Sequence, residues 1–286
     1  MNKHMLGHII AFSTILVWSL TFVQTKYLLN FLNPAEILII RFFLAWLVFF
    51  VFFPKIIFLS LKDEFIIFLS GATGIFGYYI LENIALKYTS AINVGLIVTT
   101  SPIFTAFLLY LSNKNKKIQF NILGLFLVIS GLFFLEKNKI TSINIGDLLA
   151  LGGAISFAFY SFILSKIKKD INIYLITRKS FFYGLILFLA YFMINNMQFN
   201  YHNYLQPKIF FNLFTLAFFA SFLCFLMWKV AISIIGAGKT SNYIYLVPII
   251  NTLAAYFILN ETIYLPTIIA IIFIILGLII SQKFGI

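Results

Sequence analysis

The stretch ALKYTSAINVGLIVTTSPIFTAFLLYL at residues 85–111 has a counterpart 146 residues later, AISIIGAGKTSNYIYLVPIINTLAAYF at residues 231–257. Pro102 and Pro248 take the same place in the two stretches. Both stretches are apolar and long enough to cross a bilayer as a helix, which takes about 20 residues. This agreement predicts that one half of the chain repeats the other.

Glycines outside these stretches extend the repeat. Gly131 and Gly277 keep the spacing of 146 residues, and Gly7 falls on Gly146 at an offset of 139. The two predicted units are residues 1–140 and residues 141–286.

The composition indicates a membrane protein. Of the 286 residues, 62% are hydrophobic and only 10% are charged, and the mean hydropathy is +1.04. Soluble proteins carry about 25% charged residues. A soluble fold is therefore excluded, and the length is too great for one span with an anchor.

Ten apolar runs are long enough to cross the membrane, and each is expected to be a helix because unpaired backbone groups are too costly in lipid. The runs cover residues 6–25, 34–53, 65–86, 91–111, 119–136, 146–165, 173–194, 209–235, 240–259 and 265–282. Five helices in each unit make an odd number of crossings, so the second unit must be inverted. The predicted fold is an all-α integral membrane protein of ten transmembrane helices in two inverted five-helix repeats.

Lysines in the loops predict the orientation, because cytoplasmic loops carry an excess of basic residues. With the N-terminus inside, the cytoplasmic segments hold eleven lysines and the outer segments hold five. The cytoplasmic set is Lys3, Lys55, Lys62, Lys114, Lys116, Lys117, Lys166, Lys168, Lys169, Lys239 and Lys283. The outer set is Lys26, Lys87, Lys137, Lys139 and Lys208. Both termini are therefore expected in the cytoplasm.

The sequence lacks the motifs of other protein classes. A single cysteine, Cys224, excludes a disulfide framework, and the three histidines lack zinc-site spacing. The net charge of +12 fits basic cytoplasmic loops rather than nucleic-acid binding. No phosphate-binding loop and no catalytic set of side chains is present. We expect no enzymatic activity, no metal, no cofactor and no nucleic-acid partner.

Inverted repeats are typical of secondary transporters, whose substrate site lies near the midplane between the halves. Three motifs then resemble the EamA-type members of the drug/metabolite transporter superfamily. They are AFSTILVWSLTFV at 11–23, ALKYTSA at 85–91 and LNETI at 259–263. The resemblance implies a membrane transporter of small metabolites, often an exporter of amino acids or related compounds. One departure is that Asn115 stands in the first unit where Glu261 stands in the second.

Ionisable groups inside a membrane are costly and usually face a cavity or a partner. Glu82 in the third helix can bind an amino group, carry a coupling proton, or pair with Lys229 or Lys87. Tyr78 lies one turn before it on the same face. Lys229 in the eighth helix can bind a carboxylate. Arg41 can hold an anionic substrate or pair with Glu36.

Polar and aromatic side chains predict the rest of a substrate site, although such residues also pack helices together and gather at membrane interfaces. The predicted substrate-binding set is Trp18, Thr21, Tyr78, Glu82, Asn83, Thr99, Tyr160, Trp228, Lys229, Asn242 and Tyr245. Pro102 and Pro248 each remove a helix hydrogen bond, so paired hinges or kinks are expected there.

We expect an inner-membrane transporter that works by alternating access around a cavity lined by helices one, three, four, six, eight and nine. Export of an amino acid or related metabolite is the preferred function, and uptake of a similar solute is the alternative. A non-transporting component, or a flippase subunit for a lipid-linked compound, is the alternative from another class. The expected partners are a small-molecule substrate, membrane lipid, and a coupling proton or exchanged solute. The oligomeric state is not predicted.

Overall fold

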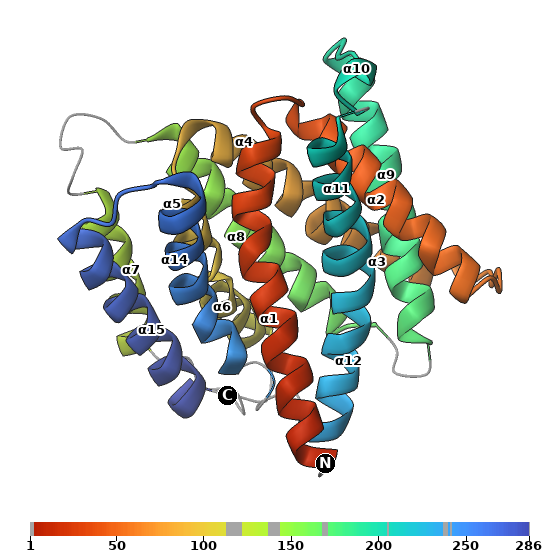
Figure 1. Cartoon of the computed structure of the whole chain (residues 1–286). Coiled ribbons are helices and arrows are strands. Elements are labelled where there is room, and N and C mark those ends of the chain that lie inside the picture. The colour runs from red at the N-terminus through yellow and green to blue at the C-terminus, as the bar shows by residue number, and fades with distance from the viewer. Residues whose placement is uncertain are drawn as a thin grey trace.

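The computed structural model of the chain describes residues 3–112, 122–136, 144–167, 171–204, 206–236, 240 and 242–285. These residues form a bundle of helices without strands (Figure 1). The first half holds α1 (Lys3–Leu28), α2 (Pro34–Phe52), α3 (Leu61–Ser70), η1 (Gly71–Gly77), α4 (Tyr78–Tyr88), α5 (Ala91–Val98), α6 (Ser101–Ser112) and α7 (Ile122–Glu136). The second half holds α8 (Ile145–Leu164), α9 (Ile173–Ile194), α10 (Tyr201–Tyr204), α11 (Pro207–Thr215), η2 (Leu216–Leu223), α12 (Cys224–Ile235), η3 (Asn242–Leu246), α14 (Val247–Leu259) and α15 (Leu265–Gly285).

Each predicted apolar run falls mainly on helix in the part of the chain that the structure describes. Among the described residues, seven helices are long and apolar enough to cross a membrane, and three shorter apolar helices cover residues 122–134, 243–259 and 265–280. Large apolar side chains cover the outside of the bundle; Phe133 is 68% exposed and Phe257 is 74% exposed. Such a surface suits lipid rather than water.

Four of the predicted helices are interrupted rather than continuous. The third contains the π-helical segment η1, and the eighth contains the π-helical segment η2. The fourth breaks at Thr99 and Thr100, and the ninth opens with the 3₁₀ turn η3. Hydropathy alone does not report the π-helical segments η1 and η2, because both stay apolar.

Pro102 and Pro248 lie directly after these breaks. Each is the second residue of a new helix, α6 or α14. The first amides of a helix have no partner within it, so a proline there costs no hydrogen bond. The prolines thus lie in the first turns of α6 and α14, and their role as hinges or kinks stays a prediction.

Capping side chains set where several helices begin. The Asn33 side chain accepts the Glu36 amide at 2.9 Å, and Glu36 accepts the Asn33 amide at 3.2 Å, which forms a capping box at the start of α2. Ser90 accepts the Asn93 amide at 3.0 Å at the start of α5.

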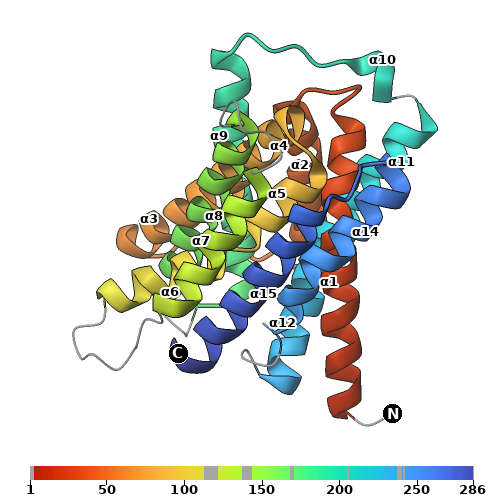
Figure 2. The ribbon, with the colours of Figure 1, turned by 90° about the vertical axis from the view of Figure 1, so that its left-hand side faces the viewer.

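Helices from the two halves pack against each other throughout the bundle. α7 lies along α15, α2 along α9 and α5 along α14. In addition, α4 packs on α8, and α1 packs on α12 and α14. Figure 2 shows α7 beside α15 from a second direction.

Helix α1 begins and α15 ends at the same end of the bundle (Figure 1). Eight of the sixteen lysines behind the predicted orientation lie outside the described residues, so the orientation stays a prediction. They are Lys114, Lys116, Lys117, Lys137, Lys139, Lys168, Lys169 and Lys239. The predicted boundary between the units, at residue 140, also lies outside them.

Glycines allow the closest helix contacts. A Cβ placed on Gly277 in α15 would lie 2.7 Å from the Gly124 carbonyl oxygen and 2.8 Å from Val128 of α7. The Gly277→Ala variant is expected to lose about 1–3 kcal/mol of stability, because the two helices must separate. Thermal unfolding in detergent measures the change.

Gly152→Ala is the matched control, since its Cβ would meet only the Leu81 side chain, at an ordinary 3.5 Å. Equal stability of the two variants would contradict close packing of α7 on α15.

Candidate functional site

A cavity of about 560 Å³ lies inside the bundle. Its walls come from both halves of the chain, namely from α1, α2, α4, α5, α6, α8, α9, α12, η3, α14 and α15. The predicted set of helices one, three, four, six, eight and nine all contribute. Helices two, seven and ten contribute as well, through Arg41, Thr177 and Leu278.

The cavity extends toward the end of the bundle where α1 begins. Leu164, the last residue of α8, and Ile173, the first residue of α9, both line it. Ile232 near the end of α12 also lines it, and α12 ends against Gly7 at the start of α1.

Hydrogen bonds tie the helices together at the opposite end. The Glu261 carboxylate accepts the Ala91 amide at 2.7 Å and the Ile92 amide at 3.0 Å. Lys26 Nζ donates to the Leu86 carbonyl at 2.5 Å and to the Thr89 carbonyl at 2.6 Å. None of these six residues lines the cavity.

Asn93 and Asp147 add a further contact at that end, between α5 and α8. The Asn93 side chain donates to the Asp147 carboxylate at 3.2 and 3.3 Å. These contacts close the end of the bundle at which α1 ends.

Glu82 lines the cavity. Its side chain is 1% exposed, and its Oε1 atom has no hydrogen-bond partner within the described part of the chain. Tyr78, one turn earlier, is the hydrogen-bonding neighbour of the carboxylate. The described residues give Glu82 no ion pair with Lys229 or Lys87, so the predicted pairings are not formed.

Arg41 of α2 reaches the same cavity. It is 1% exposed, its Nε donates to the Ser221 hydroxyl at 2.7 Å, and its guanidinium lies 4.7 Å from the centre of the Tyr79 ring. Its Nη1 atom has no partner among the residues that the structure describes.

The pairing of Arg41 with Glu36 that the sequence left open is not formed. Glu36 instead bonds Asn33, Tyr204 and the Asn200 amide. It thereby ties α2 to the segment around α10. Burial and the neighbouring Glu36 carboxylate raise the pKa of Tyr204 far above its usual value.

Lys229 lies near the end of the bundle at which α9 begins. Its Nζ donates to the Thr177 hydroxyl at 2.8 Å and to the Ile173 carbonyl at 3.4 Å, and it sits 4.8 Å from the centre of the Tyr174 ring. The charge therefore has partners from α9.

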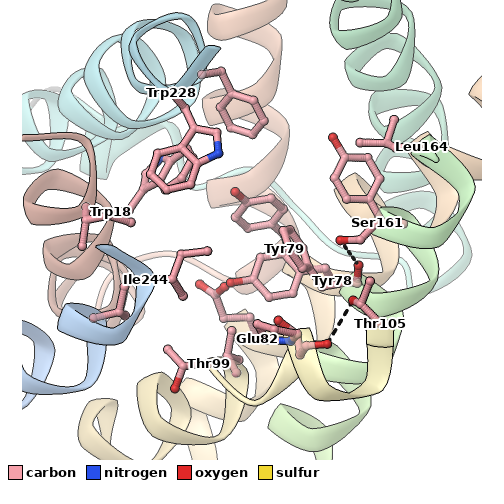
Figure 3. Close-up of a pocket in the computed structure, with 18 of the residues that line it drawn as sticks. Trp18, Tyr78, Tyr79, Glu82, Thr99, Thr105, Ser161, Leu164, Trp228 and Ile244 are labelled. Carbon is pink, nitrogen blue, oxygen red and sulfur yellow. Dashed lines mark hydrogen bonds between the residues drawn. The ribbon is translucent and has the colours of Figure 1, made fainter. Parts of the chain in front are cut away.

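Aromatic rings form one wall of the cavity. The Trp18 ring centre lies 5.3 Å from that of Trp228 and 5.6 Å from that of Phe225. Trp18 Nε1 donates to the Ala220 carbonyl at 2.9 Å, which fixes the indole. Figure 3 shows Trp18 and Trp228 on one side of the open space, with Tyr79 and Glu82 facing them.

Most of the predicted site residues line this cavity. They are Trp18, Thr21, Tyr78, Glu82, Thr99, Tyr160, Trp228, Lys229 and Tyr245, and Pro102 joins them. Pro248 and Asn83 do not line it, and the side chain of Asn242 lies outside the described structure. Tyr79, Thr105 and Ser161 line the cavity but were not predicted. Tyr79 follows Tyr78 directly and carried no separate signal.

Asn83 is buried in the helix packing instead. It is 0% exposed, and neither of its amide atoms has a hydrogen-bond partner in the described structure. An unpaired buried polar group costs about 1–3 kcal/mol, so Asn83→Leu is expected to stabilise the protein or leave it unchanged. Thermal unfolding and transport can both be measured on this variant.

Asn251→Leu is the matched comparison, because Asn251 Nδ2 donates to the Ala91 carbonyl at 2.8 Å. It should lower stability by about 1 kcal/mol or more. If Asn83→Leu is the more damaging of the two, Asn83 has a ligand or water partner and the prediction is wrong.

Residues 5–136 and residues 144–282 each match the model of the EamA-like transporter family. The chain belongs to the EamA-like transporter family. The resemblance to the drug/metabolite transporter superfamily is confirmed, and the protein is a multi-pass membrane transporter.

Relatives of this EamA-like chain carry transporter names. The uncharacterized transporter YyaM of Bacillus subtilis is 27% identical over 89% of this chain and 86% of its own. An uncharacterized transporter of Archaeoglobus fulgidus is 26% identical over 89% of both chains. A protein of known crystal structure aligns over 98% of both chains with a TM-score of 0.64 at 15% identity, which shows a shared fold.

Proposed function

We propose that this EamA-like protein is a secondary-active carrier that exports amino acids or related small metabolites by alternating access. The observation that carries the proposal is the central cavity. It holds buried charged groups, extends to one end of the bundle, and is closed by Glu261 and Lys26 at the other. A carrier needs such a site, since its substrate must be reachable from one side at a time.

The proposed architecture is ten spans in two inverted repeats. Two separate matches to the family model support it, one in each half. The π-helical segments η1 and η2 support it too, because they begin 145 and end 146 residues apart. The pairs α2 with α9, α5 with α14 and α7 with α15 each join corresponding helices of the proposed repeats.

The proposed location is the inner membrane, with both termini in the cytoplasm. The cavity would then face the cytoplasm in the conformation seen, which suits the loading of an exported solute. Energy would come from an ion gradient or from exchange of a second solute. Glu82 is the candidate for carrying a coupling proton, since it is an acid inside a span and lines the cavity.

Counterflow in proteoliposomes tests the proposal. Vesicles loaded with one unlabelled amino acid should accumulate the same labelled amino acid from outside, and the uptake should saturate. Aromatic, aliphatic, cationic and anionic amino acids are tested in turn. Absence of counterflow in every group, from protein shown to be folded, would reject amino acid transport and favour a lipid-linked substrate.

A further inference from the structure

Two buried side chains of opposite charge line the cavity without pairing with each other. Arg41 and Glu82 are each 1% exposed. Each keeps one atom without a hydrogen-bond partner in the described structure, Nη1 of Arg41 and Oε1 of Glu82. They interact electrostatically, yet no ion pair joins them in the part of the chain that the structure describes.

Two buried charges that do not pair with each other destabilise a protein that has no ligand bound. Burying a charge without a full set of partners is unfavourable, and direct pairing would satisfy both groups. Arg41 is held away from pairing by other contacts. Ser221 accepts its Nε hydrogen, and Tyr79 offers its ring face.

We propose that Arg41 and Glu82 form a two-charge site that selects a zwitterion with a bulky apolar side chain. Arg41 binds the carboxylate and Glu82 binds the ammonium group. The wall of Trp18, Phe225 and Trp228 takes up the apolar side chain. This inference rests on the proposed carrier function and names the substrate class for the same cavity.

Arg41 suits the carboxylate better than Lys229 does. A planar guanidinium presents several N–H donors to a carboxylate, and Arg41 Nη1 has no hydrogen-bond partner in the described structure. Lys229 already donates to Thr177 and to the Ile173 carbonyl, closer to the end where α9 begins.

The two π-helical segments lie next to groups that contact this pair of charges. Ser221, which fixes Arg41, belongs to η2. Tyr78, Tyr79 and Glu82 lie in the first half of α4, which follows directly on η1. Short π-helical segments within helices occur frequently at functional sites, so their placement on either side of the charges is a second observation in favour of a binding site.

Three probes that share one apolar group test the proposal. They are L-phenylalanine, phenethylamine, which lacks the carboxylate, and 3-phenylpropionate, which lacks the amino group. Binding to the purified full chain is measured by ligand-induced thermal stabilisation. The wild-type protein should bind each single-charge probe at least about tenfold more weakly than phenylalanine.

The variants then assign each charge. Arg41→Gln should weaken phenylalanine binding about tenfold or more and change phenethylamine binding by less than about twofold. Glu82→Gln should likewise weaken phenylalanine binding about tenfold or more, but it should retain the binding of 3-phenylpropionate. Arg178→Gln is the matched control, because Arg178 is another buried arginine but bonds the Phe53 and Lys55 carbonyls outside this cavity. It should keep the wild-type preference for phenylalanine.

The proposal is overturned if wild-type protein binds the amine or the acid as well as phenylalanine, or binds none of the three. It is also overturned if folded Arg41→Gln loses all three probes equally. Binding of the three probes to the wild-type protein tests the two-charge site even if a variant fails to fold. Counterflow with phenylalanine separates this test from the carrier proposal, since charge-selective binding without counterflow would reject transport and leave the site standing.

Discussion

Glu82→Gln is expected to reduce transport at least about tenfold while the protein stays folded. Glutamine has nearly the same shape as glutamate but carries no charge, so it can neither hold an ammonium group nor carry a proton. The loss should therefore appear in transport rather than in folding. The measurement is counterflow at equal amounts of reconstituted protein.

The thermal stability of Glu82→Gln should equal or exceed that of the wild type. Glu82 is 1% exposed and one carboxylate oxygen has no partner, so neutralising it removes a desolvation cost. A fall in transport together with a large fall in melting temperature would mean that Glu82 serves folding instead.

Glu64→Gln is the matched control for this prediction. Glu64 is also an acid within a long apolar helix, but it pairs with Lys179 and accepts the Tyr183 hydroxyl at 2.8 Å, away from the cavity. Its variant should transport at close to the wild-type rate. Normal transport by Glu82→Gln would show that this acid is not needed.

The helices of this fold could be predicted from the sequence because lipid imposes a simple rule. A crossing helix needs a long apolar run, and the runs at 34–53 and 173–194 match α2 and α9 within a residue. The π-helical interruptions of these helices could not be predicted in the same way. The segments GATGIFG and LAFFASFL are as apolar as their neighbours, so nothing in their hydropathy separates a π-helical turn from an α-helical one.

Some of the charged residues near the cavity could likewise be predicted from the sequence, and others could not. Glu82 could be predicted as a site residue because an acidic side chain inside a membrane span is costly and usually faces a cavity or a partner. The pairing of Glu36 with Arg41 was wrong, since five residues on a helix place two side chains on different faces. Glu36 turns toward Asn200 and Tyr204, which are far away in the sequence.

Glu261→Gln is expected to open the far end of the bundle. The carboxylate accepts the free amides of Ala91 and Ile92 at the start of α5, where a negative charge is favoured by the helix dipole. Lys26 binds the Leu86 and Thr89 carbonyls at the end of α4, where a positive charge is favoured. Both charges therefore hold the turn between α4 and α5.

Glu261 and Lys26 stabilise only the end of the bundle at which α5 begins. The repeat places Asn115 where Glu261 stands, so the first unit has no acid at the matching position. Asn115 lies outside the described residues. An acid in one unit alone makes the two ends unequal, and the conformation closed at the Glu261 end should be the more stable one. Glutamine keeps one acceptor oxygen but removes the charge-assisted bonds, so the balance should shift toward the opposite conformation.

Thiol labelling measures this shift. Cys224 is the single cysteine, so Cys224→Ser gives a background in which Thr21→Cys places one thiol on the cavity wall. A membrane-impermeant reagent is added to either face of oriented vesicles. With Glu261 intact, labelling should come from the face where α1 begins. With Glu261→Gln, labelling from the other face should rise about tenfold, which corresponds to a shift of about 1.4 kcal/mol.

Glu36→Gln is the control at the same end. Glu36 also accepts backbone amides, from Asn33 and Asn200, but it holds α2 to the α10 segment and not α5. Its variant should leave the labelling pattern of Thr21→Cys unchanged. If both variants raise labelling equally, the effect is general loosening of that end. If neither does, the charge of Glu261 does not keep the far end closed.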